Sequence, residues 1–312
     1  MKLVTLFSLK GAPGVTTLAC LLGSAWSGTR PVVVVEADPA GGDLAARFGL
    51  SARVGWASLA SSTRRSGSIP ALGPHLQTLP GGLPVLVAAR GEERRSPDAD
   101  EGAVVRADAG DAPDGGSGLT IVDLGRVGSG DDVSERWLAI SDVALLVVRG
   151  DASSSVQVRD RREALADICQ DRLGAVVVGG DYSVGELEEF TGIPTVTDIP
   201  FDTSAADVAN GGHGSARRLG RSPLWAAVIR MAATLDARVD GGPVLPDHLE
   251  QYDEARDDPR DVARDEAPGS LVGESFPFRR RPLRHLVSRK GPDARLRSAP
   301  DLADEDDRWA DA

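Results

Sequence analysis

A glycine-containing loop near the N-terminus carries residue types that bind phosphate. It lies between an apolar run, residues 3–9, and a stretch of helical periodicity, residues 16–26. Glycines let successive backbone N–H groups converge on an anion, and the start of a helix adds its positive end. The alternative is a strand-to-helix turn that binds nothing. The predicted nucleotide-binding residues of this loop are Lys10, Gly11, Ala12, Pro13, Gly14, Val15, Thr16 and Thr17.

Two carboxylates follow other apolar runs of the chain. Asp38 comes after the run at 31–35, and Asp123 directly follows the run at 119–122. Because the carboxyl ends of parallel strands meet at one edge of an α/β sheet, both side chains are expected near the loop. From the loop, the Thr16 hydroxyl is predicted to reach a magnesium ion, and Asp38 at this edge is predicted to orient a water. For Asp38, the alternative is a turn former or helix cap.

The loop resembles the deviant Walker A motif of the ParA/MinD family of ATPases, Lys-Gly-Gly-x-Gly-Lys-Thr-Thr. Lys10 matches the early lysine of that motif. Asp123 matches the Walker B position of the family, which implies that Asp123 holds magnesium together with Thr16. The resemblance implies ATP and Mg²⁺ as cofactors, with Lys10 and Asp38 as catalytic residues. It also implies a nucleotide-dependent homodimer in which Lys10 reaches the partner's phosphates. Ala12 replaces the second glycine and Val15 replaces the second lysine, which implies weakened binding and slow hydrolysis.

Two further segments carry the resemblance. The chain reads Glu-Ala-Asp-Pro at 36–39, where the family has Asp-x-Asp-Pro, so that Asp38 matches the water-positioning acid. At 199–202 it reads Ile-Pro-Phe-Asp, similar to the family's Ile-Pro-x-Asp segment near the adenine. This implies that Pro200 and Asp202 contact the nucleotide; an ordinary proline turn is the alternative. The Asn that many members place after the preceding strand is absent.

Apolar runs rich in β-branched residues alternate with helical patterns along the first three quarters of the chain. This alternation predicts an α/β fold with a doubly wound, mostly parallel sheet flanked by helices, as in ParA/MinD-like P-loop NTPases. The predicted strands are 3–9, 31–35, 83–89, 119–122, 144–148 and 175–178. The predicted helices are 16–26, 133–140, 155–169, 184–190 and 223–238.

Composition divides the chain into two parts. Residues 1–239 are predicted to form the nucleotide-binding domain, with a surface insertion at 92–118 that is rich in Asp, Arg, Gly and Ala. Residues 240–312 are acidic and poor in periodic apolar positions, and we predict a largely disordered tail. Within the tail, 276–290 is a basic island. It is interpreted as a contact for anionic lipid, a docking motif for a protein partner, or a solvated charge run.

Charge and composition narrow the function classes. The formal net charge of -12 does not favour nucleic-acid binding. Cys20 and Cys169 both lie in apolar, helix-like stretches, so we expect a reducing, cytoplasmic compartment, with membrane contact only at its inner face. No apolar stretch is long enough to cross a bilayer. The histidines are scattered without partners at metal-ligand spacing, so no metal site built on histidine is predicted.

Two hypotheses follow from the sequence. The first is an ATP-binding protein, weakly or slowly hydrolytic, that acts as a nucleotide-dependent switch in positioning or partitioning a cellular assembly such as a chromosome, septum, pilus or secretion machinery. The second is a non-catalytic scaffold or regulator on a degenerate P-loop fold. Nucleotide binding by the altered loop separates the two.

Overall fold

Eight strands form one sheet in the computed structural model, which describes residues 2–11, 13–26, 30–66, 71–88 and 118–239. Their order is β3-β4-β2-β5-β1-β6-β7-β8, and β3 alone runs antiparallel to its neighbour. This confirms the predicted doubly wound, mostly parallel sheet. The strands are β1 Lys2–Ser8, β2 Val32–Glu36, β3 Gln77–Thr78, β4 Pro84–Leu86, β5 Leu119–Arg126, β6 Val143–Gly150, β7 Leu173–Gly180 and β8 Thr195–Ile199.

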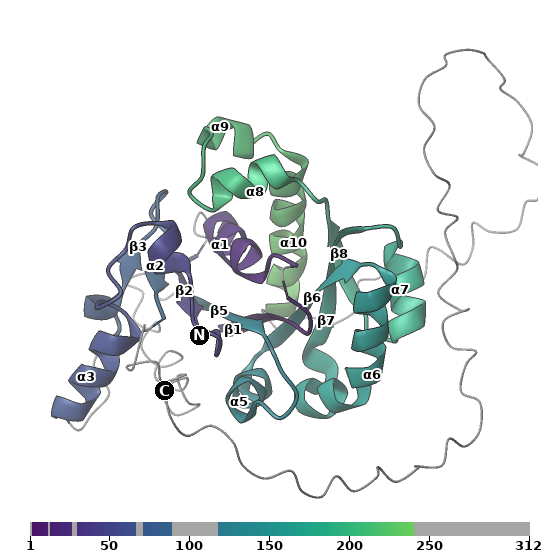
Figure 1. Cartoon of the computed structure of the whole chain (residues 1–312), viewed down its shortest axis with the longest axis horizontal. Coiled ribbons are helices and arrows are strands. Elements are labelled where there is room, and N and C mark those ends of the chain that lie inside the picture. The colour runs from purple at the N-terminus through teal and green to yellow at the C-terminus, as the bar shows by residue number, and fades with distance from the viewer. Residues whose placement is uncertain (1, 12, 27–29, 67–70, 89–117, 240–312) are drawn as a thin grey trace, which may run out of the picture. The chain divides into compact units, whose positions relative to one another are not determined.

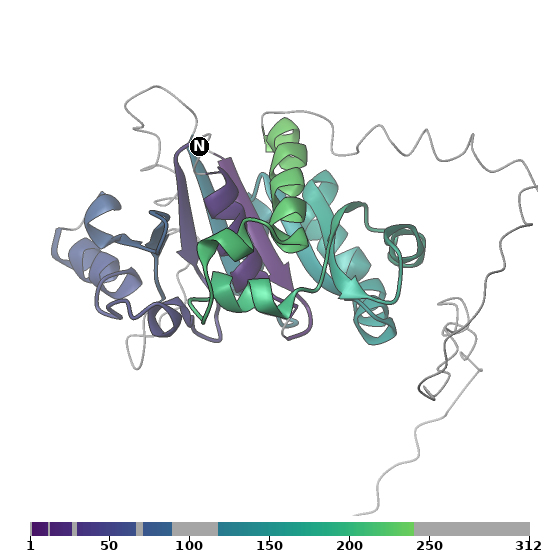
Figure 2. The same ribbon diagram turned by 90° about the horizontal axis from the view of Figure 1, so that it is seen from above.

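Helices cover both faces of the sheet. Figures 1 and 2 show α1, α8 and α10 together on one face, whereas α5 and α6 lie on the other face with α7 beside α6. The α-helices are α1 Val15–Trp26, α2 Leu44–Arg47, α3 Trp56–Ser66, α5 Asp132–Ile140, α6 Ala152–Cys169, α7 Val184–Thr191, α8 Thr203–Ala209, α9 Ala216–Leu219 and α10 Pro223–Val239. Two short 3-10 turns, Gly73–His75 and Gln170–Arg172, complete the described elements.

The central strands are buried on both faces, which explains their uninterrupted apolar sequences. In β1, both Leu6 and Phe7 are fully buried although they point to opposite sides of the sheet. Trp26 of α1 and Trp137 of α5 are also almost completely buried, one on each face. The carboxyl ends of β1, β2 and β5, where the predicted site residues lie, are therefore held by a packed core.

Several short elements were not predicted from the sequence. They include β3, β8, α2, α3 and α8, and they lack the length or the apolar periodicity that marks the longer elements. In α3, for example, only Trp56 and Leu59 are buried. The predicted insertion at 92–118 lies outside the described residues except for Gly118, and the tail at 240–312 with its basic island lies wholly outside them. No described helix has the length and hydropathy needed to cross a membrane.

Candidate nucleotide-binding site

The predicted phosphate loop joins β1 to α1, and the first turn of α1 presents free backbone donors. Gly14 has φ +95°, a conformation that favours glycine, and its carbonyl accepts the first helical hydrogen bond from Leu18 N–H at 2.9 Å. The amides of residues 15–17 are therefore not used inside the helix. They form the kind of positive helix start that binds an anion. Ala12, also predicted to contact the nucleotide, lies outside the described residues.

Val15 turns into the core instead of into the loop. It is 5% exposed and belongs to the apolar cluster between the sheet and α10. The position where the resemblance places a phosphate-binding lysine is thus occupied by a buried apolar side chain.

Lys10 points towards α6. Its Nζ donates a hydrogen bond to Ser153 Oγ at 2.5 Å, in the first turn of that helix. Lys10 also lines a small cavity of about 160 Å³ together with Pro13, Arg149 and Asp151. The cation predicted to bind phosphate therefore lies on the β6–α6 side of the loop.

Asp123 lies in β5 and is 1% exposed. Its Oδ1 accepts the N–H of Gly125 at 2.9 Å, whereas Oδ2 is buried without a well-formed hydrogen bond in the described chain. Burial raises the pKa of this carboxyl to about 7, and the nearby carboxylates of Glu36 and Asp38 add to the shift. Hydrogen bonding from the Thr16 hydroxyl and from Gly125 opposes it.

The structure thus brings together Thr16 and Asp123, the two predicted magnesium ligands. A carboxylate oxygen with spare capacity beside a hydroxyl is a donor set suited to Mg²⁺, which prefers oxygen ligands and usually takes only one or two from the protein. No cluster of three or more His, Cys, Asp or Glu side chains that could hold a metal by itself occurs in the described residues. The residues present fit magnesium whose remaining ligands are phosphates and water.

Asp38 lies next to the β5 end. Its Oδ1 accepts the Ala40 N–H at 2.7 Å and so forms a tight turn after β2. A Cβ at Gly125 would lie 2.0 Å from Asp38 Oδ2, so the side chain packs directly against the backbone two residues beyond Asp123. The turn-forming role that sequence left open for Asp38 is observed, and the carboxylate also lies beside the predicted metal ligand.

Glu36 holds this segment in place, a role that sequence reasoning missed. Its Oε1 accepts the N–H groups of Asp43 and Leu44 at 2.7 and 2.9 Å, and its Oε2 accepts the N–H of Ala88 at 2.8 Å. Burial raises the pKa of this carboxyl, and the three N–H bonds oppose the shift. The residue is 1% exposed. One carboxylate therefore links the end of β2 to the start of α2 and to the segment after β4.

Pro200 and Asp202 line a larger cavity of about 300 Å³ on the β8–α8 side of the loop. Gly14 and Thr17 form part of the same wall, so the structure brings these four predicted residues together. Asp202 is also the N-cap of α8: its Oδ1 accepts from Ala205 N–H and from the Ser204 hydroxyl, both at 2.9 Å. These hydrogen bonds lower the pKa of Asp202.

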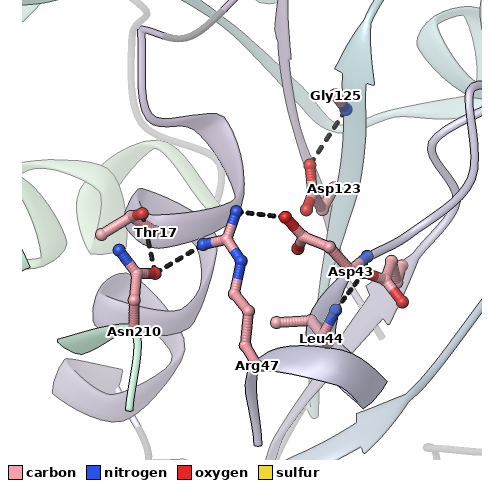
Figure 3. A network of polar contacts seen from close by, with 8 residues as sticks. Thr17, Asp43, Leu44, Arg47, Asp123, Gly125 and Asn210 are labelled. Atoms are coloured by element: carbon pink, nitrogen blue, oxygen red, sulfur yellow. Dashed lines mark hydrogen bonds and ion pairs between the residues drawn. The ribbon is translucent and has the colours of Figure 1, made fainter. Parts of the chain in front are cut away.

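Arg47 and Asn210 complete the surroundings of α1, and neither was predicted. Thr17 Oγ1 donates to Asn210 Oδ1 at 3.0 Å, and Arg47 Nη1 donates to the same oxygen at 2.6 Å. Arg47 Nη2 forms an ion pair with Asp43. Figure 3 shows the guanidinium between Thr17 and Asn210 on one side and Asp43 on the other. The signal that could have revealed Arg47 is its spacing of four residues from Asp43 on a short helix.

A strand, a glycine-containing loop and a helix with free amides, together with a buried Asp on the adjacent strand, define the architecture of a P-loop nucleotide-binding fold. No protein-family model matches the chain, and no curated protein sequence is significantly similar to it. Solved structures do match.

A ParA family ATPase from Chlorobium tepidum superposes with a TM-score of 0.62 at 19% identity, covering 74% of this chain and 98% of that one. MinD from Pyrococcus horikoshii, described as complexed with Mg-ADP, gives 0.59 at 17% identity, with 75% and 96% covered. The MinC:MinD cell division protein complex of Aquifex aeolicus gives 0.58 at 18% identity, with 76% and 96% covered. The chain therefore has the ParA/MinD fold.

Proposed function

We propose that the chain binds ATP together with Mg²⁺ at the β1–α1 loop and uses the bound nucleotide as a switch. One observation carries the proposal: Thr16, in the first turn of α1 whose amides are not used inside the helix, interacts through its side chain with Asp123, whose Oδ2 is buried without a well-formed hydrogen bond. A buried carboxylate oxygen without a hydrogen bond is unfavourable unless a cation reaches it. A helix start favours an anion at the same place. A magnesium-bound polyphosphate meets both requirements.

The residues of the site would have the following roles. The first-turn amides of α1 would bind phosphate oxygens, while Thr16 and Asp123 would hold the metal, which when bound neutralises developing charge on the phosphates. Asp38 would orient a water for attack, and Lys10 would contact phosphates, including those bound by a second copy of the chain in a dimer. Pro200 and Asp202 would contact the base in the adjoining cavity.

Slow hydrolysis is part of the proposal. The buried Val15 removes one charge-assisted phosphate contact, worth about 1.5 to 3 kcal/mol where it is present. Weak binding and a low turnover rate follow from that loss.

Resemblance in fold supports a role in spatial organisation. One neighbour is described as a cell division protein in complex with MinC, and another as bound to Mg-ADP. We propose that this chain acts in the cytoplasm to position or partition a cellular assembly: a chromosome, a septum, a pilus or secretion machinery. A nucleotide-dependent homodimer would be the active form. Residues 276–290 would contact a protein partner or the inner face of the membrane.

The second candidate function is a non-catalytic scaffold on the same fold, and the buried Val15 is the observation that favours it. A binding experiment separates the two. Titration of the full chain with a fluorescent ATP analogue and Mg²⁺ is expected to give micromolar affinity. Asp123→Asn is expected to abolish the dependence on Mg²⁺, and Lys10→Ala to weaken binding. If the wild-type chain fails to bind at millimolar nucleotide, the ATPase proposal is wrong and the scaffold remains.

A further inference from the structure

The surroundings of the phosphate loop are acidic for a site that must accept a polyphosphate. The carboxylates of Glu36, Asp38 and Asp123 gather at the ends of β2 and β5, and those of Glu36 and Asp38 both raise the pKa of Asp123. The loop itself offers an apolar Val15, and Lys10 is held by Ser153 on the α6 side. Phosphate binding on the opposite side, towards β2 and α2, requires another cation.

Arg47 is a cation on this side of the loop, beside the first turn of α1. It ends α2, and it shares the Oδ1 of Asn210 with the Thr17 hydroxyl, so its guanidinium lies beside a residue whose own amide is free. Burial and the nearby carboxylates raise the pKa of the Cys20 thiol in α1, and the charge of Arg47 partly opposes this rise, so its guanidinium acts on groups of this helix. Figure 3 shows the guanidinium directed towards α1.

We propose that Arg47 binds the phosphates of the nucleotide and compensates for the missing lysine at Val15. This inference rests on the proposed function, because it assigns a second cation to the same site. A guanidinium can donate two parallel hydrogen bonds to phosphate, so it suits a role in which it approaches from outside the loop.

Asp43 restrains Arg47 through an ion pair. Their ion pair occupies Nη2, and the N–H of Asp43 donates to Glu36, which fixes the Asp43 backbone. The Arg47 side chain remains 28% exposed, which leaves it able to turn towards a ligand. Phosphate would thus compete with Asp43 for the guanidinium. Removing the Asp43 carboxylate should therefore strengthen nucleotide binding, whereas removing Arg47 should weaken it.

A purely structural role predicts a different pattern. If Arg47 served only to hold Asp43 and Asn210, neither substitution would lower the affinity for ATP more than the affinity for adenosine. Exposed pairs with this spacing contribute little to stability. Loss of the pair alone would leave nucleotide affinity almost unchanged.

The test is a titration of the full chain with ATP, ADP and adenosine at fixed Mg²⁺ and salt. Arg47→Ala is expected to raise the Kd for ATP roughly 10- to 100-fold, the loss of one or two charge-assisted hydrogen bonds. The Kd for adenosine should stay within about twofold, since adenosine carries no phosphate. Arg47→Lys should recover part of the affinity, and Asp43→Asn should bind ATP at least as tightly as wild type. Arg64→Ala, which removes an exposed arginine of α3, is the matched control for net charge.

Each outcome either supports or overturns the inference about Arg47. Selective loss of ATP and ADP affinity in Arg47→Ala, retained or improved affinity in Asp43→Asn, and no change in Arg64→Ala support the inference. Two outcomes overturn the inference about Arg47 while the proposed function stands, provided that the wild type binds ATP. One is an unchanged Kd for ATP in Arg47→Ala, and the other is equal weakening of ATP binding by the Arg47 and Asp43 variants. Failure of the wild type to bind ATP refutes the proposed function and this inference with it. Melting curves without nucleotide identify any variant that has lost its fold, and Arg47→Lys then replaces Arg47→Ala.

Discussion

Two buried carboxylates lie side by side at the ends of neighbouring strands, and they differ in how well they are satisfied. Glu36 of β2 and Asp123 of β5 are register partners, and each is 1% exposed. Three backbone N–H groups saturate Glu36. Asp123 accepts one backbone N–H, and its Oδ2 is left without a well-formed hydrogen bond in the described chain.

The difference separates a structural carboxylate from one that is available to a ligand. Buried polar atoms in folded proteins are nearly always hydrogen-bonded, so an unsatisfied oxygen needs a reason. Glu36 has its partners within the chain and fixes the segment that carries Asp38. Asp123 has no well-formed hydrogen bond at Oδ2, lies beside the Thr16 side chain of the phosphate loop, and is the better candidate for metal binding. Glu36 and Asp123 are therefore equally buried, but we expect a structural role for the first and a ligand-binding role for the second.

The largest expected effect on stability follows from removing the saturated carboxylate. Glu36→Ala leaves three backbone N–H groups, one buried and two partly buried, without acceptors, and we expect the free energy of unfolding to fall by about 4 kcal/mol. Urea denaturation followed by circular dichroism measures it. Asp198→Ala, at an exposed position of β8, should change stability by less than about 0.5 kcal/mol. A loss below about 1 kcal/mol for Glu36→Ala would show that Glu36 does not hold this segment.

The unsatisfied carboxylate should behave in the opposite way. Because burial raises the pKa of Asp123 from 3.8 to about 7, the folded chain favours its protonated form. Its ionisation therefore lowers stability progressively as the pH rises from about 4 to about 7, and the loss is complete above that range. Without metal, Asp123→Asn should be more stable than wild type by at most about 4 kcal/mol at pH 8.

The same variant should show no advantage at pH 4, where the wild-type carboxyl is protonated in the folded and nearly half protonated in the unfolded chain. Thermal melts of both proteins between pH 4 and pH 8, in the presence of a chelator, measure the difference. A wild-type chain that is as stable as Asp123→Asn at pH 8 would mean that Oδ2 is satisfied in solution, and the contrast with Glu36 would disappear.

A smaller effect is expected where the backbone approaches the Glu36 carboxylate. A Cβ at Gly42 would lie 1.8 Å from Glu36 Cδ, so Gly42→Ala must displace a side chain that three hydrogen bonds hold. We expect a loss of about 2 kcal/mol. Gly128→Ala is the matched control, because a Cβ there meets nothing within 4 Å. Equal stability of the two variants would indicate that the Glu36 carboxylate moves freely.

The sequence predicted those parts of the fold whose signal is local. Buried parallel strands such as β1 and β5 give unbroken apolar runs, and α10 shows its apolar face at helical spacing. By contrast, β3 has two residues and α2 has four, so neither is long enough to establish a period. Such elements depend on tertiary contacts that sequence reasoning does not see.

The residues of the candidate site differ in the same way, because some have a local sequence signal and others depend on tertiary contacts. The loop and Asp123 were predictable because a glycine loop and a strand-ending carboxylate are contiguous patterns. The contact between Arg47 and Asn210 joins residues 163 apart in the chain, and only the topology brings them together. The role of Glu36 was hidden for another reason: its position was noted as a substitution for Asp, but the backbone amides that it binds carry no sequence signature.

The smallest expected change in stability is that of Asp38→Asn. This variant also separates the structural role of Asp38 from its proposed role in hydrolysis. Its turn uses one oxygen, which accepts the Ala40 N–H, and the carbonyl oxygen of an Asn can replace that acceptor. Asp38→Asn should therefore change the free energy of unfolding by less than about 0.5 kcal/mol. If the carboxylate orients the attacking water, phosphate release from Mg·ATP should nevertheless fall to the background seen with Asp123→Asn. Unchanged release by a normally folded Asp38→Asn would leave Asp38 as a turn former only. In that case, the number of hydrogen bonds that each carboxylate accepts would distinguish Asp123, the candidate metal ligand, from the structural Glu36. It would not identify the residue that orients the attacking water.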